Sequence, residues 1–138
     1  KKSKKEKTTK PKNTTAFNAI LKIQSEMSDT QTLAYLEKHK FSVNGTDKAG
    51  HSPLTMAAYQ NKLKTVKYLI KNGAKINYIQ KNEDEDTALS SAIYGNVHTA
   101  SKDYKVIDYL LSQGASMELA RAASPEEVEA YEKKRKKK

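Results

Sequence analysis

Apolar positions in the middle of the chain recur with the spacing of two short amphipathic helices. The first helix presents an apolar face made of Leu54, Ala57 and Ala58. The second presents a face made of Leu63, Val66, Leu69 and Ile70. Ser52 and Pro53 suit the N-cap and the first turn of the first helix, and Gly73 suits the left-handed position that ends the second. The pattern therefore predicts a helix–turn–helix unit.

This unit is repeated along the chain. Tyr-Leu, an aliphatic residue and Gly-Ala occupy matching places in residues 67–77 and 108–118, and a weaker copy lies at residues 34–44. Residues 52–58 match residues 87–93 in the same way. One helix pair cannot bury its apolar face alone, and about three stacked units are the usual minimum. We therefore predict an all-α solenoid of about three repeats, called repeats one, two and three, at about 15–46, 47–81 and 82–118.

The middle copy resembles the ankyrin repeat family. Residues 47–58 (Asp-Lys-Ala-Gly-His-Ser-Pro-Leu-Thr-Met-Ala-Ala) and residues 69–77 (Leu-Ile-Lys-Asn-Gly-Ala-Lys-Ile-Asn) follow the family pattern nearly throughout. Repeat three departs from it in two places, because Ala88 replaces the proline and an insertion at roughly 97–102 separates its helices. Repeat one fits mainly in its second helix. The resemblance covers about residues 15–118 and implies a fold that binds proteins and does not catalyse reactions.

The resemblance also implies where a protein partner docks, namely on the loop tips and on the exposed face of the first helices. The matching positions are Lys48, Ala49, His51 and Tyr59 in repeat two, and Glu83, Asp84, Asp86 and Tyr94 in repeat three. Tyrosine suits an interface anchor because it combines a large apolar area with a polar tip. Packing of Tyr59 and Tyr94 between neighbouring helices is the alternative.

Four consecutive acidic residues, 83–86, fall at the tip of the hairpin-like loop, or finger, that joins repeats two and three. A calcium loop needs alternating oxygen ligands and a distal glutamate, and this spacing is missing. The cluster is therefore interpreted either as a solvated tip or as a contact for a basic surface, including the lysine-rich ends of this same protein.

The formal net charge of +10 is concentrated at the two ends of the 138-residue chain. Residues 1–13 carry +6 and residues 131–138 carry +5, so the remainder is close to neutral at −1. The basic residues are Lys1, Lys2, Lys4, Lys5, Lys7, Lys10, Lys12, Lys133, Lys134, Arg135, Lys136, Lys137 and Lys138. Three hypotheses stay open for them: solubilising tails, a nuclear import signal, and electrostatic binding to RNA or another polyanion.

The domain organisation follows from these charges and from one capping signature. Residues 1–13 have no aliphatic or aromatic side chain apart from those of lysine stems, and they are expected to be a disordered basic tail. The repeat domain is expected at 14–123. Ser124, followed by Pro125 and by Glu127, has the pattern of a capping box, which predicts a C-terminal helix at 124–138 with a basic end.

Several classes of function are disfavoured by composition. The chain has no Cys, which excludes disulfides, thiolate metal sites and thiol catalysis. Its three His residues (His39, His51 and His98) are isolated, and no phosphate-binding loop or nucleophile motif is present. We therefore expect no enzyme, cofactor, metal, small-molecule substrate or membrane span, and an intracellular location in cytoplasm or nucleus.

The leading hypothesis is a protein-interaction or scaffold module whose basic ends attach to a polyanionic surface or direct the chain to the nucleus. The first alternative is a small structural component of a ribosome or another RNA–protein assembly, with the tails on the RNA backbone. The second alternative is an exported ankyrin-repeat effector. A segment upstream of Lys1 stays open as well, because the numbering does not begin with Met.

Overall fold

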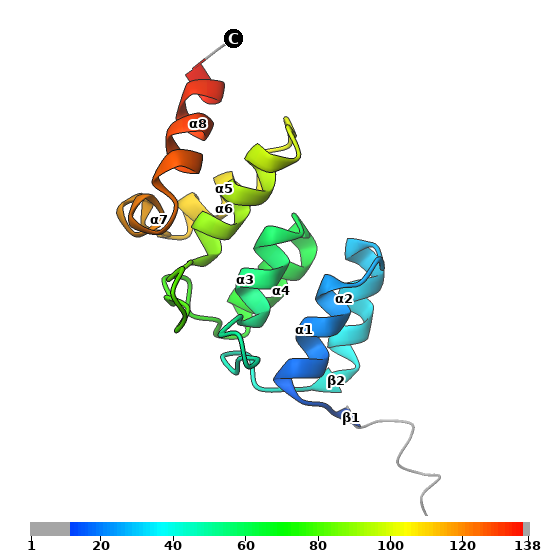
Figure 1. The fold of residues 1–138 in the computed structure, drawn as a ribbon. Helices are drawn as coiled ribbons and strands as arrows, with labels where there is room; N and C mark the ends of the chain where they lie inside the picture. Colours follow the sequence, from blue (N-terminus) through cyan, green and yellow to red (C-terminus); the bar gives the residue numbers. More distant parts are fainter. Residues whose placement is uncertain (1–11, 137–138) are drawn as a thin grey trace, which may run out of the picture.

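The computed structural model describes residues 12–136, and it shows helix pairs stacked side by side in chain order (Figure 1). The helices are α1 (Ala16–Gln24), α2 (Asp29–Glu37), α3 (Pro53–Tyr59), α4 (Leu63–Lys71), α5 (Ala88–His98), α6 (Lys105–Ser112), α7 (Met117–Ala123) and α8 (Pro125–Lys136). The three predicted repeats correspond to the pairs α1–α2, α3–α4 and α5–α6. The all-α solenoid expected from the periodicity is therefore confirmed, and α7 and α8 close its C-terminal end.

Two short strands flank the helices of the first repeat, one before α1 and the other after α2. Strand β1 (Lys12–Asn13) pairs in parallel with β2 (His39–Lys40), and the Thr14 N–H donates to the Lys40 carbonyl at 2.8 Å. The expected disordered tail at 1–13 lies outside the described residues except for β1. The described part of the chain thus begins with a strand that pairs with the segment after α2.

The first helix of each repeat starts at a hydroxyl N-cap. The side chains of Thr15, Ser52 and Thr87 accept hydrogen bonds of 3.0–3.1 Å from backbone N–H groups three residues ahead. These bonds satisfy donors that the first turn of a helix would otherwise leave unpaired. At the other end of repeats two and three, Gly73 and Gly114 both adopt a φ of 97°, which confirms the predicted left-handed helix ends.

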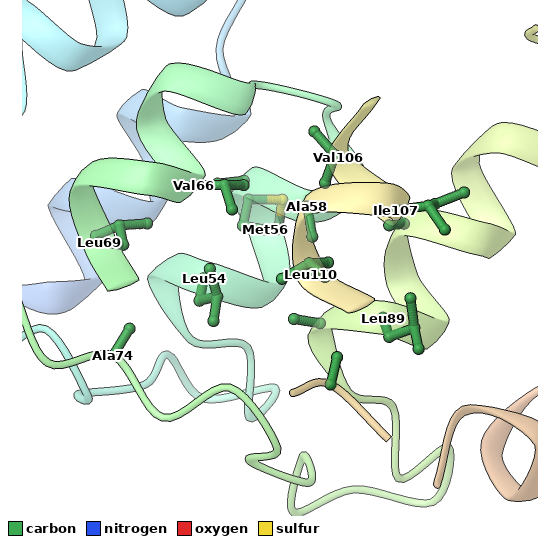
Figure 2. Close-up of a cluster of buried hydrophobic side chains, with 14 of the residues drawn as sticks. Leu54, Met56, Ala58, Val66, Leu69, Ala74, Leu89, Val106, Ile107 and Leu110 are labelled. Atoms are coloured by element: carbon green, nitrogen blue, oxygen red, sulfur yellow. The ribbon is translucent and has the colours of Figure 1, made fainter. Parts of the chain in front are cut away.

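The buried core runs continuously through the stack. Figure 2 shows its central part, where α3, α4, α5 and α6 contribute Leu54, Met56, Ala58, Val66, Leu69, Leu89, Val106, Ile107 and Leu110. The apolar faces predicted for the repeat-two helices supply Leu54, Ala57, Ala58, Val66 and Leu69 to this core. Each helix pair therefore buries its apolar face against its neighbours, as stacking requires.

One asparagine in repeat one and one in repeat two join the backbones of successive repeats. Asn44 accepts from the Lys75 N–H at 2.9 Å and donates to the Gly73 carbonyl at 3.0 Å. Asn77 makes the same pair of bonds one repeat later, to Ser116 at 2.9 Å and Gly114 at 3.2 Å. Each asparagine thus pairs polar backbone groups of the next repeat's turn.

A buried lysine links repeats one and two, and the sequence analysis did not identify it. The Lys62 ammonium donates to the carbonyls of Ile23 (2.6 Å) and Ser25 (3.3 Å) at the end of α1, and to the Thr32 hydroxyl (2.9 Å). Burial lowers the pKa of Lys62, and the nearby charge of Asp29 opposes that shift. The lysine therefore acts as a cap for the C-terminal carbonyls of α1.

The insertion in repeat three corrects one expectation. Residues 97–102 were expected to lengthen a loop, but α5 has 11 residues where α3 has 7, so the insertion partly lengthens the helix. The remaining loop is held by Lys134 of α8, whose ammonium donates to Asn96 Oδ1 and to the Ser101 carbonyl, both at 2.9 Å. The C-terminal helix therefore fixes the inserted segment.

The start of α8 corrects a second expectation. The helix begins at Pro125 as predicted, but the capping box does not form among the described residues. The Ser124 hydroxyl lies 3.5 Å from Asp86 Oδ1, and Glu127 Oε2 lies 3.0 Å from His98 Nε2. Both residues of the predicted box are therefore used for contacts with repeat three.

The two ends of the stack differ. Phe17 and Leu21 of α1 stand in the same register as Leu54 and Ala58 of α3, counted from the N-caps. Phe17 is 51% exposed and Leu21 is 45% exposed, whereas Leu54 and Ala58 are each 1% exposed. Among the described residues no repeat precedes α1, so the positions that a preceding repeat covers in α3 face solvent.

This register comparison predicts the effect of truncating matched positions. Leu54→Ala should lower the free energy of unfolding by about 2–4 kcal/mol, because it leaves a cavity in the packed core. Phe17→Ala should cost less than about 1 kcal/mol, because its side chain is half exposed. Chemical denaturation of both variants would measure the difference, and equal losses would contradict the description of α1 as an open end.

Candidate functional site

A pocket of about 390 Å³ lies where the finger between repeats two and three meets α3, α5 and the start of α8. It is lined by His51, Thr55, Met56, Tyr59, Gln80, Asp84, Asp86, Ser91, Tyr94, Ala123, Ser124 and Glu127. Five of the eight residues expected to contact a protein partner are among them: His51, Tyr59, Asp84, Asp86 and Tyr94. The structure therefore brings together residues that are up to 43 positions apart in the sequence.

The other three expected contact residues lie outside the pocket lining. Lys48 and Ala49 are exposed on the finger between repeats one and two, and Glu83 is exposed on the next finger. The two fingers are joined by hydrogen bonds, since Asn82 Nδ2 donates to the Ala49 carbonyl at 2.9 Å and the Tyr78 hydroxyl donates to the Gly50 carbonyl at 2.8 Å. The two fingers are therefore fixed to each other, and these three exposed residues stay outside the lining.

The finger between repeats two and three is held in shape by its own polar groups. Asn82 Oδ1 accepts from the N–H groups of Asp84 (3.1 Å) and Glu85 (3.0 Å), and Gln80 donates its N–H to the Asp86 carbonyl at 2.8 Å. Glu85 adopts a φ of 52° in this turn. Asp86 is therefore not part of a solvated tip but points back to the helices.

Asp86 is half buried, and its Oδ1 atom accepts a hydrogen bond from the Ser90 hydroxyl at 2.9 Å. Burial raises the pKa of Asp86, the hydrogen bond from Ser90 opposes this, and the nearby charge of Asp84 raises it further. A partly desolvated carboxylate in a pocket is a candidate for binding a ligand.

The neighbouring Asp47 has the opposite balance. Partial burial would raise its pKa, but hydrogen bonds from the side chain and backbone of His51 and the charge of His51 lower the pKa below its ordinary value. The His51 Nδ1 lies 3.0 Å from Asp47 Oδ2. His51 is therefore held at the mouth of the pocket by the finger between repeats one and two.

Two tyrosines form the wall of the pocket on α3 and α5. Tyr59 is 47% exposed and Tyr94 is 40% exposed, and their ring centroids lie 6.4 Å apart at an interplanar angle of 40°. A Cβ atom at Gly95 would lie 2.8 Å from the Tyr59 carbonyl, so only glycine permits the close approach of α5 to α3 at this point. Both tyrosines are thus partly packed against a neighbouring ring and partly exposed, so the alternative of packing between neighbouring helices describes part of their surface.

A histidine and a glutamate support the second tyrosine. The His98 ring lies 4.1 Å from the Tyr94 ring, and His98 Nε2 lies 3.0 Å from Glu127 Oε2. The insertion in repeat three lengthens α5 by the turn that carries His98. Sequence analysis missed this contribution because Glu127 was assigned to a capping box.

The basic residues of α8 have unequal surroundings. The Arg135 guanidinium donates to Asp108 at 3.0 Å and lies 4.2 Å from the Tyr104 ring centroid, and Lys134 caps the inserted segment. The Lys133 side chain is 74% exposed, with its ammonium 3.6 Å from the similarly exposed carboxylate of Glu129, and Lys136 is exposed as well. Lys12 lies in β1, while the other basic residues expected to bind a polyanion, at positions 1–10 and 137–138, lie outside the described residues.

Within residues 12–136, no group of three or more His, Asp or Glu side chains is arranged to hold a metal ion. In the same range, no helix is both long enough and apolar enough to cross a membrane.

The electrostatics of Asp86 predict a pH-dependent stability. Its folded-state pKa is raised above the ordinary value of 3.8, so the native state binds more protons than the unfolded state just above pH 3.8, and stability falls as pH rises through that window. Asp86→Asn removes the cost of the buried charge and should raise Tm at pH 7, with a smaller gain at pH 3. Thermal melts at both pH values measure this, with Glu83→Gln as the control because Glu83 is exposed on the same finger and does not contribute to the pKa shift of Asp86. A lower Tm for Asp86→Asn at pH 7 would contradict the prediction.

Comparison with known proteins adds to this picture. The family model of ankyrin repeats matches the chain in three copies, over residues 4–80 and 25–121. None of the curated proteins matches it significantly. A solved structure of a predatory endopeptidase from Bdellovibrio bacteriovorus in complex with an immunity protein contains a chain that is 26% identical, with a TM-score of 0.54. The match covers 71% of this chain but only 46% of that one, so this chain spans less than half the length of that neighbour.

The family match, the stacked helix pairs and the repeated asparagine bridges all indicate the same repeat architecture. The chain belongs to the ankyrin repeat family, which is generally a non-catalytic fold for protein interaction.

Proposed function

We propose that this protein is a non-catalytic interaction module that binds a protein partner through the pocket between Asp86, the two tyrosines and α8. The observation that supports this most directly is the gathering of five expected contact residues, from two fingers and two helices, around one cavity of about 390 Å³. Protein interfaces favour such clusters of exposed tyrosine and polar groups around a central depression.

The stack keeps this site rigid. The pocket rests on helices whose opposite faces are in the core, since Leu54 and Ala58 of α3 are each 1% exposed and Ile93 of α5 is fully buried. The fingers are fixed by hydrogen bonds between them. A partner therefore meets a site that is already formed, which limits the entropy lost on binding.

This proposal predicts the effect of removing the tyrosine wall. The double variant Tyr59→Ser, Tyr94→Ser should weaken capture of the protein partner from an extract of the source cells by at least about tenfold, since exposed aromatic anchors at interfaces each contribute about 2 kcal/mol or more. Quantitative mass spectrometry of the captured proteins measures the loss. Leu21→Ser is the matched control, because Leu21 is exposed to a similar extent on a different repeat. Equal capture by all three proteins would overturn the proposal.

We also propose a second role, for the basic ends, because Lys133 and Lys136 are exposed in the last turns of α8. Together with the lysines of residues 1–10 they offer charge for a polyanion such as RNA, or for a nuclear import receptor that recognises the same runs. Lys134 and Arg135 contribute less to such binding, because both are already engaged with the inserted segment and with Asp108.

The polyanion role predicts a steep salt dependence. If about six phosphates are neutralised, affinity for single-stranded poly(U) should fall roughly 300-fold between about 50 and 200 mM salt. Deleting residues 1–11 and 137–138 and introducing Lys133→Gln and Lys136→Gln should abolish this binding. Deletion of the entire segment 131–138 is unsuitable because Tyr131 is buried in the core.

The control for this measurement carries Lys75→Gln and Lys102→Gln, which remove exposed lysines from the body. Fluorescence anisotropy at several salt concentrations compares the proteins. Poly(U) binding that survives the loss of both ends would contradict the role. Absence of poly(U) binding together with nuclear accumulation that depends on the same lysines would favour the import signal.

A further inference from the structure

The pocket is acidic although the chain as a whole is strongly basic. Its lining includes three carboxylates, those of Asp84, Asp86 and Glu127, and among the described residues it includes no lysine or arginine. The His51 imidazole at its mouth is bound to Asp47 at 3.0 Å. The positive charge of the chain lies at its two ends, and the remaining residues sum to −1, so the carboxylates of the pocket are not offset by a basic body.

One carboxylate oxygen in the pocket has unused hydrogen-bonding capacity. Both hydroxyl contacts to Asp86, from Ser90 at 2.9 Å and from Ser124 at 3.5 Å, are made to Oδ1. No hydrogen bond or ion pair from the described residues reaches Oδ2. None of the described side chains has a buried oxygen without a partner, so Oδ2 is open to solvent and a cationic donor that arrives with a ligand can reach it.

The aromatic wall favours the same kind of ligand. Tyr59 and Tyr94 present partly exposed rings beside these carboxylates, and Tyr94 is held by its contact with His98. Cations are attracted to the faces of aromatic rings, and the planar guanidinium of arginine combines stacking on a ring with paired hydrogen bonds to a carboxylate. The ammonium group of lysine can supply the positive charge, but it cannot stack on a ring and form paired hydrogen bonds to a carboxylate at the same time.

We propose that the pocket receives an arginine side chain of the protein partner, whose guanidinium lies against the Tyr59–Tyr94 wall and donates to Asp86. This inference rests on the proposed interaction function and specifies the chemistry of the partner at that site. Glu127, which is fixed by His98, adds charge on the α8 side of the pocket. The arginine replaces the solvation that Asp86 has lost on folding.

The direct test is a titration of the isotope-labelled full-length chain with two short peptides, acetyl-Gly-Arg-Gly-amide and the same peptide with neutral citrulline in place of arginine. The arginine peptide should shift the backbone amide signals of Tyr59, Asp86 and Tyr94 with a dissociation constant on the order of 1–10 mM, as suits a ligand of this size. Citrulline has nearly the same shape but no charge, and it should bind at least about tenfold more weakly.

Two pairs of matched variants locate the binding. Asp86→Asn and Glu127→Gln should each weaken the arginine peptide, Asp86→Asn by about tenfold. Glu83→Gln and Glu126→Gln remove the same charge from exposed neighbours outside the lining and should leave binding unchanged. Asp86→Asn is expected to fold, since it removes a buried charge.

Three results would overturn the inference: equal binding of the citrulline peptide, equal effects of the pocket variants and their controls, or no shift with either peptide. Its failure is separable from failure of the interaction function. A partner whose capture requires Tyr59 and Tyr94 but is unchanged by Asp86→Asn would sustain the function and overturn the arginine site.

Discussion

The structure depends on one constraint, which is that no helix pair can bury its apolar face without a neighbour. Leu54 and Phe17 illustrate it, because equivalent positions are buried in repeat two and half exposed in repeat one. Burial of a large side chain stabilises a fold by about 1.5–3 kcal/mol, so each added neighbour contributes substantially in a stack of three repeats. The asparagine bridges and the Lys62 cap support this stacking, and α7 and α8 cover its last repeat.

Polar groups fix the geometry of the stack where apolar contacts are not directional. Asn44 and Asn77 join the turn of one repeat to the next, and Lys62 satisfies the last carbonyls of α1. In repeat three the position of these asparagines is taken by Glu118, which already lies in the first turn of α7. In the described residues α7 is followed by the single helix α8, so no glycine turn of a further repeat lies there for an asparagine to bond.

The closing helices serve stability and the pocket together. Val128 and Tyr131 of α8 are buried on the core, so they cover the last repeat. Ser124 and Glu127 at the start of the same helix line the pocket instead of capping the helix. The Asp86 carboxylate in the same pocket has a raised pKa because it is partly desolvated. The start of α8 therefore contributes to the pocket, while the rest of the helix covers the core.

The sequence by itself determined the repeat, its helices, their caps and their turns, because these follow from local periodicity and from residues such as Ser52, Pro53 and Gly73. It also identified five pocket residues through the resemblance of repeats two and three to a family pattern. Only the tertiary structure decided the roles of Lys62, Glu127 and His98. Their partners lie 29 to 39 residues away in the chain, and no local pattern specifies such a pairing. Local propensities and caps determine where the helices begin and end. The pocket, by contrast, forms only when stacking brings residues of separate repeats into contact.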